Sequence, residues 1–309
     1  MLPVLATIPP PPINGFELGP LDVRLYGILI AFGAYLALRL MVKRYASFGG
    51  DAGAAETAAL VMLGAGFLGA RLAYVLPRLD HFLANPQEIL AIWQGGLALF
   101  GGLTVGSIVA LWYARRRSLD VPALMDAVAP AVPLAQAIGR WGNYFNQELY
   151  GRPTDVAWAL EVEPAYRRPG YEDVATFHPT FLYESLWNLA LFGVLLWVGR
   201  RGKLRRGALA FVYFIGYGIG RAWIEALRVD TAERYLGLSR NNWVALVVIV
   251  LGVAGLIWWQ RRATPEPAGT PAVEPDFVPE GDMSDDADTN DDSPADAGTP
   301  RDTSDDEVR

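Results

Sequence analysis

The chain has 309 residues, of which 52% are hydrophobic and 19% charged, with ten tryptophans and a mean hydropathy of +0.21. This composition argues against an ordinary soluble protein and favours an integral membrane protein. Charge is uneven along the chain, because residues 264–309 carry 15 acidic and two basic side chains whereas residues 1–263 carry 24 basic and 18 acidic ones. There is no cysteine, which excludes disulfides, thiolate metal sites and a catalytic cysteine in this chain.

Seven apolar stretches of about 18 to 22 residues are each long enough to cross a hydrocarbon core of about 30 Å as a helix. They cover residues 22–42, 57–77, 96–114, 121–138, 180–199, 207–227 and 241–260. Basic clusters follow alternate stretches, at Lys43 and Arg44, 115–117, 200–206, and 261–262. By the positive-inside rule those ends face the cytoplasm. We therefore expect an all-α integral membrane protein with seven transmembrane helices, its N-terminus outside and its C-terminus cytoplasmic.

We assign residues 1–263 to the membrane domain and residues 264–309 to a separate tail. The first 21 residues lack the basic and apolar regions of a cleavable signal, so we expect the first span to serve as its own insertion signal. Residues 264–309, rich in Asp, Pro, Ser, Thr and Ala, are too polar to bury a core and are predicted to be a disordered acidic cytoplasmic tail. Its negative charge argues against docking to anionic lipid.

Five charged residues fall within the predicted spans: Arg71, Asp126, Glu184, Arg221 and Glu225. Each would cost about 2.5 to 3.5 kcal/mol at the bilayer centre if it faced lipid. We therefore expect them to line an internal polar cavity, to pair with one another, or to lie nearer the membrane surface. In the fourth span, two prolines at 130 and 133 predict a kink or break.

The sixth span carries Tyr217, Arg221, Glu225 and Arg228 at spacings of four, four and three, which stacks them on one helical face. One interpretation is a basic, polar wall near the outer leaflet. The alternative is an Arg221 to Glu225 pair within the helix that neutralises itself. The sequence alone leaves both open.

The fourth span is followed by "GRWGNYFNQELYG" at 139–151, in which Arg140, Asn143 and Asn146 are spaced by three. A guanidinium group with amides suits an oxyanion such as phosphate. A polar interfacial loop whose side chains satisfy their own backbone is the alternative. The Gly-rich stretch 93–106 favours close packing of transmembrane helices through small residues. It is not a phosphate-binding loop, because no Lys or Ser/Thr follows at the required place.

The chain contains "GRWGNYFNQELYGR" at 139–152, "RLYGI" at 24–28, "HPTFLYE" at 178–184 and "GRAWIEALR" at 220–228. Together these motifs closely resemble the prolipoprotein diacylglyceryl transferase family over about residues 20–260. The resemblance implies transfer of the diacylglyceryl group of phosphatidylglycerol to the lipobox cysteine thiol of a bacterial prolipoprotein, with release of glycerol phosphate. It also implies the bacterial plasma (inner) membrane, with the active site towards the outer face. A membrane transporter or lipid-binding scaffold for anionic phospholipid is the alternative, since intramembrane arginines and broken helices also mark transport paths.

The resemblance also implies site residues. Arg140, Asn143, Glu148 and Gly151 match the family signature, Tyr26 its first-span tyrosine and Arg221 its sixth-span arginine. We expect Arg140 and Arg221 to bind the phosphate, Asn143 and Tyr26 to orient the substrates, and Glu148 and Glu225 to position the arginines. The predicted catalytic set is Arg140, Arg221, Tyr26, Glu148 and Asn143, and the predicted substrate-binding set is Arg140, Asn143, Asn146, Gly151, Tyr217, Glu225, Arg221 and His178.

The base is not implied, because the family's histidine positions in the first and third spans are Arg24 and Phe100 here. His178 is a candidate proton acceptor, although a His-Pro pair before a span also starts helices. His81, in a loop without a matching motif, is expected to face solvent. We expect no cofactor, no metal and no nucleic-acid partner.

Overall fold

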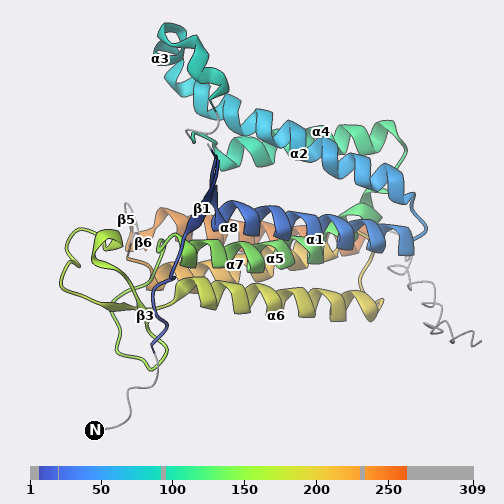
Figure 1. Ribbon diagram of the computed structural model, residues 1–309. Helices are drawn as coiled ribbons and strands as arrows, with labels where there is room; N and C mark the ends of the chain where they lie inside the picture. The colour runs from blue at the N-terminus through green and yellow to red at the C-terminus, as the bar shows by residue number, and fades with distance from the viewer. Residues whose placement is uncertain (1–6, 20, 92–94, 230–233, 263–309) are drawn as a thin grey trace, which may run out of the picture. The chain divides into compact units, whose positions relative to one another are not determined.

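The computed structural model describes residues 7–19, 21–91, 95–229 and 234–262, which form mainly helices (Figure 1). The long helices are α1 (Leu25–Ser47), α2 (Ala52–Val75), α4 (Leu99–Arg116), α5 (Val121–Phe145), α6 (Thr180–Arg200), α7 (Leu209–Leu227) and α8 (Arg240–Arg262). Short helical turns are η1 (Leu76–Arg78), α3 (Leu79–Ala84), η2 (Pro86–Leu90) and η4 (Pro164–Tyr166). The predicted acidic tail lies outside the described residues.

Small antiparallel strand pairs accompany these helices. They are β1 (Gly15–Leu18) with β2 (Leu21–Arg24), β3 (Leu160–Glu161) with β4 (Thr176–Phe177), and β5 (Arg234–Tyr235) with β6 (Leu238–Ser239). In the second pair Leu160 lies opposite Phe177, and both side chains are buried in an apolar cluster with Tyr150 and Phe181. This cluster fixes the segment between α5 and α6 beside the start of α6.

Five helical segments are long and apolar enough to cross a membrane: α1, the continuous run from α2 through α3, α5, α6 and α8. Helices α4 and α7 cover the two remaining segments that the sequence predicted. The described residues therefore form a largely helical, multi-pass membrane protein. Helix α1 begins at Leu25, three residues later than predicted, because residues 21–24 pair with β1 as a strand.

The helices pack as α2 against α4, α1 against α5, α7 against α8, and α6 against both α5 and α7. Glycines permit the close approach of α2 and α4. A Cβ atom added at Gly69 would lie 2.4 Å from Val105 Cβ, and one added at Gly101 would lie 2.8 Å from the Gly69 carbonyl oxygen. The prediction that the Gly-rich stretch packs helices is confirmed.

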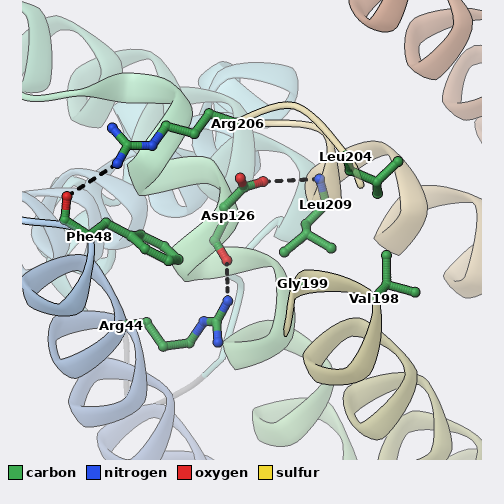
Figure 2. A pocket seen from close by; sticks show the side chains of 8 residues that line it. All are labelled: Arg44, Phe48, Asp126, Val198, Gly199, Leu204, Arg206 and Leu209. Atoms are coloured by element: carbon green, nitrogen blue, oxygen red, sulfur yellow. Dashed lines mark hydrogen bonds between the residues drawn. The ribbon is translucent and has the colours of Figure 1, made fainter. Parts of the chain in front are cut away.

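Helix α5 runs unbroken through both internal prolines, so the expected break does not occur. Pro130 has no N–H group, which frees the carbonyl of Asp126 four residues earlier. Arg44 Nη2, from α1, donates to that carbonyl at 3.4 Å (Figure 2). A side chain from a neighbouring helix thus compensates for the missing backbone bond, as membrane helices require.

Two of the five intramembrane charges are satisfied by backbone groups. The Asp126 carboxylate accepts from the N–H group of Leu209 at 3.0 Å (Figure 2). It also accepts from the N–H group of Gly207 at 2.8 Å, and so stabilises the start of α7. Arg71 donates to the carbonyls of Ile89 at 2.8 Å and Gly95 at 2.7 Å, which ties the segment before α4 to α2. The other three charges meet in the candidate site.

Candidate functional site

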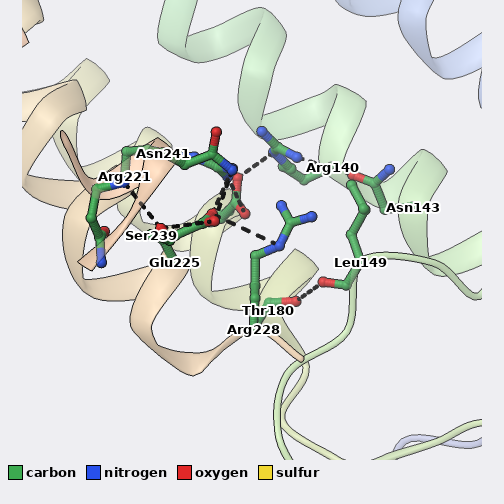
Figure 3. Close-up of polar contacts among 11 residues, drawn as sticks. Arg140, Asn143, Leu149, Thr180, Arg221, Glu225, Arg228, Ser239 and Asn241 are labelled. Carbon is green, nitrogen blue, oxygen red and sulfur yellow. Dashed lines mark hydrogen bonds and ion pairs between the residues drawn. The ribbon is translucent and has the colours of Figure 1, made fainter. Parts of the chain in front are cut away.

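A polar network connects α5, α6 and α7 at one end of the helix bundle (Figure 3). Arg140 near the end of α5 places Nε 2.6 Å from Oε2 of Glu184, near the start of α6. The other carboxylate oxygen of Glu184 lies 3.6 Å from Nη1 of Arg221, near the end of α7. The Glu184 side chain is only 8% exposed. One buried carboxylate therefore bridges two guanidinium groups that come from different helices.

A second buried carboxylate, Glu225, extends the network to α8. Its Oε2 lies 2.7 Å from Arg221 Nη2 and 4.0 Å from Arg228 Nε. Its Oε1 accepts from Asn241 Nδ2 at 2.8 Å and Ser239 Oγ at 3.4 Å (Figure 3). The predicted Arg221 to Glu225 pair is present, but it is one link in a network of four helices rather than a self-contained pair.

Side chains of the 139–151 motif form a second set of contacts that begins at Arg140. Asn143 Oδ1 accepts from Arg140 Nη1 at 3.2 Å, and Asn143 Nδ2 donates to Glu148 Oε1 at 2.9 Å. Asn146 Nδ2 donates to the same Glu148 oxygen at 3.3 Å. Glu148 therefore acts on Arg140 through Asn143. Because α5 continues to Phe145, Arg140 and Asn143 lie on a helix and not in the loop that the alternative required.

The backbone of Gly151 and Arg152 ties the segment after α5 to the start of α6 and the end of α7. Its N–H donates to the His178 carbonyl at 2.9 Å, and Arg152 N–H donates to the Leu227 carbonyl at 2.7 Å. A Cβ atom at position 151 would lie 2.6 Å from His178 Cβ and 3.1 Å from the carbonyl oxygens of His178 and Leu227. Only glycine allows these chain segments to approach so closely.

The two predicted tyrosines lie in different surroundings. The Tyr26 ring, on α1, packs over Gly142, where an added Cβ would lie 2.3 Å from Tyr26 Cδ2. Tyr26 thus touches the motif helix between Arg140 and Asn143. Tyr217 stacks on Tyr213 with ring centroids 5.9 Å apart and packs against an apolar cluster of α6 and α7 that includes Leu191.

The two histidines of the chain have different surroundings. His178 lies two residues before α6, and its Nδ1 is 3.2 Å from Tyr183 Oη, an oxygen that accepts from Trp158 Nε1 at 2.8 Å. Burial lowers the pKa of His178, which favours the neutral imidazole. His81 lies on α3, its side chain 55% exposed and 2.8 Å from Glu88. Phe100 is 74% exposed on α4.

Sequence reasoning missed how four residues take part. Glu184 was identified as an intramembrane charge and as the end of the "HPTFLYE" block, but not as the group shared by both arginines. Arg228 was expected on the helical face of the sixth span but not in the site; α7 instead ends at Leu227, and Arg228 follows it in an extended conformation. Ser239 and Asn241 lie just before and within α8 and carried no sequence signal.

Among the described residues, no group of three or more His, Cys, Asp or Glu side chains could hold a metal ion.

Comparisons with known proteins agree on one family. A family model described as prolipoprotein diacylglyceryl transferase matches residues 14–258. The chain is 41% identical over 256 residues to phosphatidylglycerol–prolipoprotein diacylglyceryl transferase 2 of Streptomyces coelicolor, covering 82% of this chain and 81% of that protein. It is 44% identical over 250 residues to phosphatidylglycerol–prolipoprotein diacylglyceryl transferase of Synechococcus elongatus, covering 78% of this chain and 85% of that protein. A Corynebacterium glutamicum relative is 40% identical over 288 residues, covering 89% and 90%.

Proposed function

Because the chain belongs to the prolipoprotein diacylglyceryl transferase family, we propose that it transfers the diacylglyceryl group of phosphatidylglycerol to the lipobox cysteine of a prolipoprotein signal peptide. The cysteine sulfur attacks the carbon of the diacylglyceryl group that carries the phosphate ester. A carbon–sulfur bond forms, the carbon–oxygen bond to phosphate breaks, and glycerol phosphate leaves with the electron pair. The absence of cysteine in the chain suits an enzyme that handles the thiol of another protein.

The observation that supports this most directly is the meeting of Arg140 and Arg221 at one buried carboxylate. Negative charge builds up on the phosphate as the carbon–oxygen bond breaks. Guanidinium groups fixed in a poorly hydrated site stabilise such charge without having to reorganise, and this electrostatic effect is usually a large part of catalysis. The two arginines are the proposed phosphate ligands.

The remaining site residues have supporting roles in the proposal. Asn143 and Tyr26 orient the lipid headgroup or the nucleophile, since one contacts Arg140 and the other packs beside it on Gly142. Glu225 holds Arg221 directly, and Glu148 holds Arg140 through Asn143. Asn146, Gly151 and Tyr217 complete the substrate-binding set, Gly151 through its backbone.

His178 is the proposed proton acceptor. Its lowered pKa keeps the imidazole neutral near pH 7 and therefore able to accept a proton. A free thiol, with a pKa near 8.5, is already a few per cent thiolate at that pH. General base catalysis contributes about 100-fold to 10,000-fold where it operates. A His178→Gln variant that transfers at the normal rate, with an unchanged pH profile, would remove His178 from this role.

Incubation of the purified full-length protein with phosphatidylglycerol and a lipobox peptide tests the function. We expect mass spectrometry to find one diacylglyceryl group on the peptide cysteine, and glycerol phosphate to appear in equal amount. A peptide with serine in place of cysteine is the control and should remain unmodified. Phospholipid movement or binding without an adduct would favour the transporter or scaffold alternative.

We also propose the topology and the domain division. Residues 1–263 would form the catalytic domain with seven spans in the bacterial inner membrane and the N-terminus outside, followed by a cytoplasmic tail. Arg140, Glu184 and Arg221 would then face the outer leaflet. The basic residues at the opposite helix ends support this orientation, because positive charge accumulates on the cytoplasmic side.

Single cysteines introduced into this cysteine-free chain test the orientation. We expect a membrane-impermeant maleimide to label Asp173→Cys, in the segment between α5 and α6, on intact spheroplasts. Ser47→Cys, at the end of α1, should react only after the membrane is permeabilised. Both positions are exposed, so a difference in labelling reports the side of the membrane. The reverse pattern would invert the proposed topology.

A further inference from the structure

Within the described part of the chain, the formal charges of the polar network cancel. Three arginines, at 140, 221 and 228, are connected through side-chain contacts to three glutamates, at 148, 184 and 225. A phosphodiester adds one more negative charge when it enters. A network that is neutral overall attracts an anion weakly, and removing the phosphate from water has a large cost unless new pairs form. A phosphate that takes an arginine from one of the carboxylates gains such a pair.

The contacts of the three carboxylates differ in a way that identifies which one yields. Glu225 is 2% exposed and is held by Arg221 at 2.7 Å and by Asn241 at 2.8 Å, with Ser239 in addition. Glu148 accepts from two side-chain amides. Within the described part of the chain, the contacts of Glu184 are with the two arginines, and the one to Arg221 is long at 3.6 Å. That contact joins Glu184 to α7, and it is longer than the Arg140 to Glu184 and Arg221 to Glu225 contacts.

We infer that Glu184 is an exchangeable counter-ion, which holds Arg221 in the empty site and releases it to the lipid phosphate while remaining paired with Arg140. This inference rests on the proposed function and makes Glu184 a positioning residue. In the empty site its carboxylate keeps two guanidinium groups together that would otherwise repel. When product leaves, its return to Arg221 competes with glycerol phosphate and helps to displace it.

A Glu184→Gln variant tests the exchange, because the side chain keeps its shape but loses the charge that competes with phosphate. We expect glycerol phosphate to bind at least about tenfold more tightly than to the wild type, the lower end for coupling between close charge pairs. KM for phosphatidylglycerol should fall and kcat should fall as well, since product leaves more slowly. A purely structural role would instead lower kcat without tightening glycerol phosphate binding, and that result would overturn the inference.

Two comparison variants make the result specific. Glu225→Gln removes a carboxylate that is fixed by several donors, so it should misplace Arg221 and weaken glycerol phosphate binding. Glu172→Gln, in the exposed turn at Gly170, should match the wild type in KM and kcat. If the wild type shows no transfer, the proposed function fails. If it transfers normally but Glu184→Gln binds glycerol phosphate no more tightly, only the exchange fails.

The wild-type protein provides a second test that does not depend on the stability of a variant. In an experimental structure with phosphatidylglycerol bound, we expect Arg221 Nη1 and Glu184 to lie farther apart than about 4 Å, the usual limit of an ion pair. The Arg140 to Glu184 pair should remain. An intact Arg221 to Glu184 contact beside bound phosphate would contradict the exchange.

Discussion

Replacement of Arg140 or Arg221 by alanine is expected to lower kcat by at least about 100-fold, the scale of losing one charge-stabilising donor. Each arginine comes from a different helix and lies beside a different oxygen of Glu184, so neither side chain can take the position of the other. The measurement is the initial rate of diacylglyceryl transfer to a lipobox peptide at saturating phosphatidylglycerol. A rate near that of the wild type would exclude the substituted arginine from the mechanism.

Loss of an arginine also leaves Glu184 or Glu225 buried with fewer partners, which costs about 3 to 5 kcal/mol when a buried ion pair is broken. Thermal unfolding must therefore be measured on each variant. Arg140→Lys and Arg221→Lys separate the effects, because lysine keeps the positive charge but not the planar, multiply donating group. Arg201→Ala is the matched control: Arg201 stacks on Trp197 at the opposite end of α6 from Glu184, and its loss should leave transfer unchanged.

The helices could be predicted from the sequence because each depends on a local property, a continuous apolar run of sufficient length. All seven predicted segments coincide with long helices, and the boundaries differ by up to seven residues. The end of α5 was predicted too early for the same reason. Hydropathy falls at Arg140, but the helix continues because Glu184 and Asn143 satisfy the polar side chain inside the bundle.

The partners within the site could not be predicted in the same way. Periodicity placed Arg221 and Glu225 on one face of α7, and they do pair at 2.7 Å. It could not show that Glu184 of α6 lies between Arg140 and Arg221, because that contact depends on how three helices pack. Tyr217, on the same face of α7 as Arg221, lies about 6 Å from it along the helix and stacks on Tyr213 one turn earlier.

The prolines of α5 show how local rules and tertiary contacts combine. Pro130 does free a carbonyl, as the sequence rule states. The sequence does not reveal that Arg44, 82 residues apart from Asp126, donates to that carbonyl. Of the predicted kink or break, the break does not occur, while the reason for expecting it was correct.

Gly151→Ala is expected to disable the enzyme although it changes no side chain that could do chemistry. The new Cβ would lie 2.6 Å from His178 Cβ and 3.1 Å from two backbone carbonyl oxygens. These neighbours belong to the backbone or lie next to it, so only a shift of the chain can relieve the overlap. That shift would move the start of α6 relative to the end of α7, and so separate Glu184 from Arg221.

We expect a loss of about 100-fold in kcat/KM, because a displacement near 1 Å in a catalytic arrangement costs about that much. Overpacking of this kind destabilises by about 1 to 3 kcal/mol, so Tm should fall by several degrees. Gly193→Ala is the matched control, since an added Cβ on that part of α6 meets no atom within 4 Å and should leave Tm and the transfer rate unchanged or slightly raised. Wild-type activity in Gly151→Ala would show that the junction tolerates a side chain and that the alignment of Arg140, Glu184 and Arg221 does not depend on it.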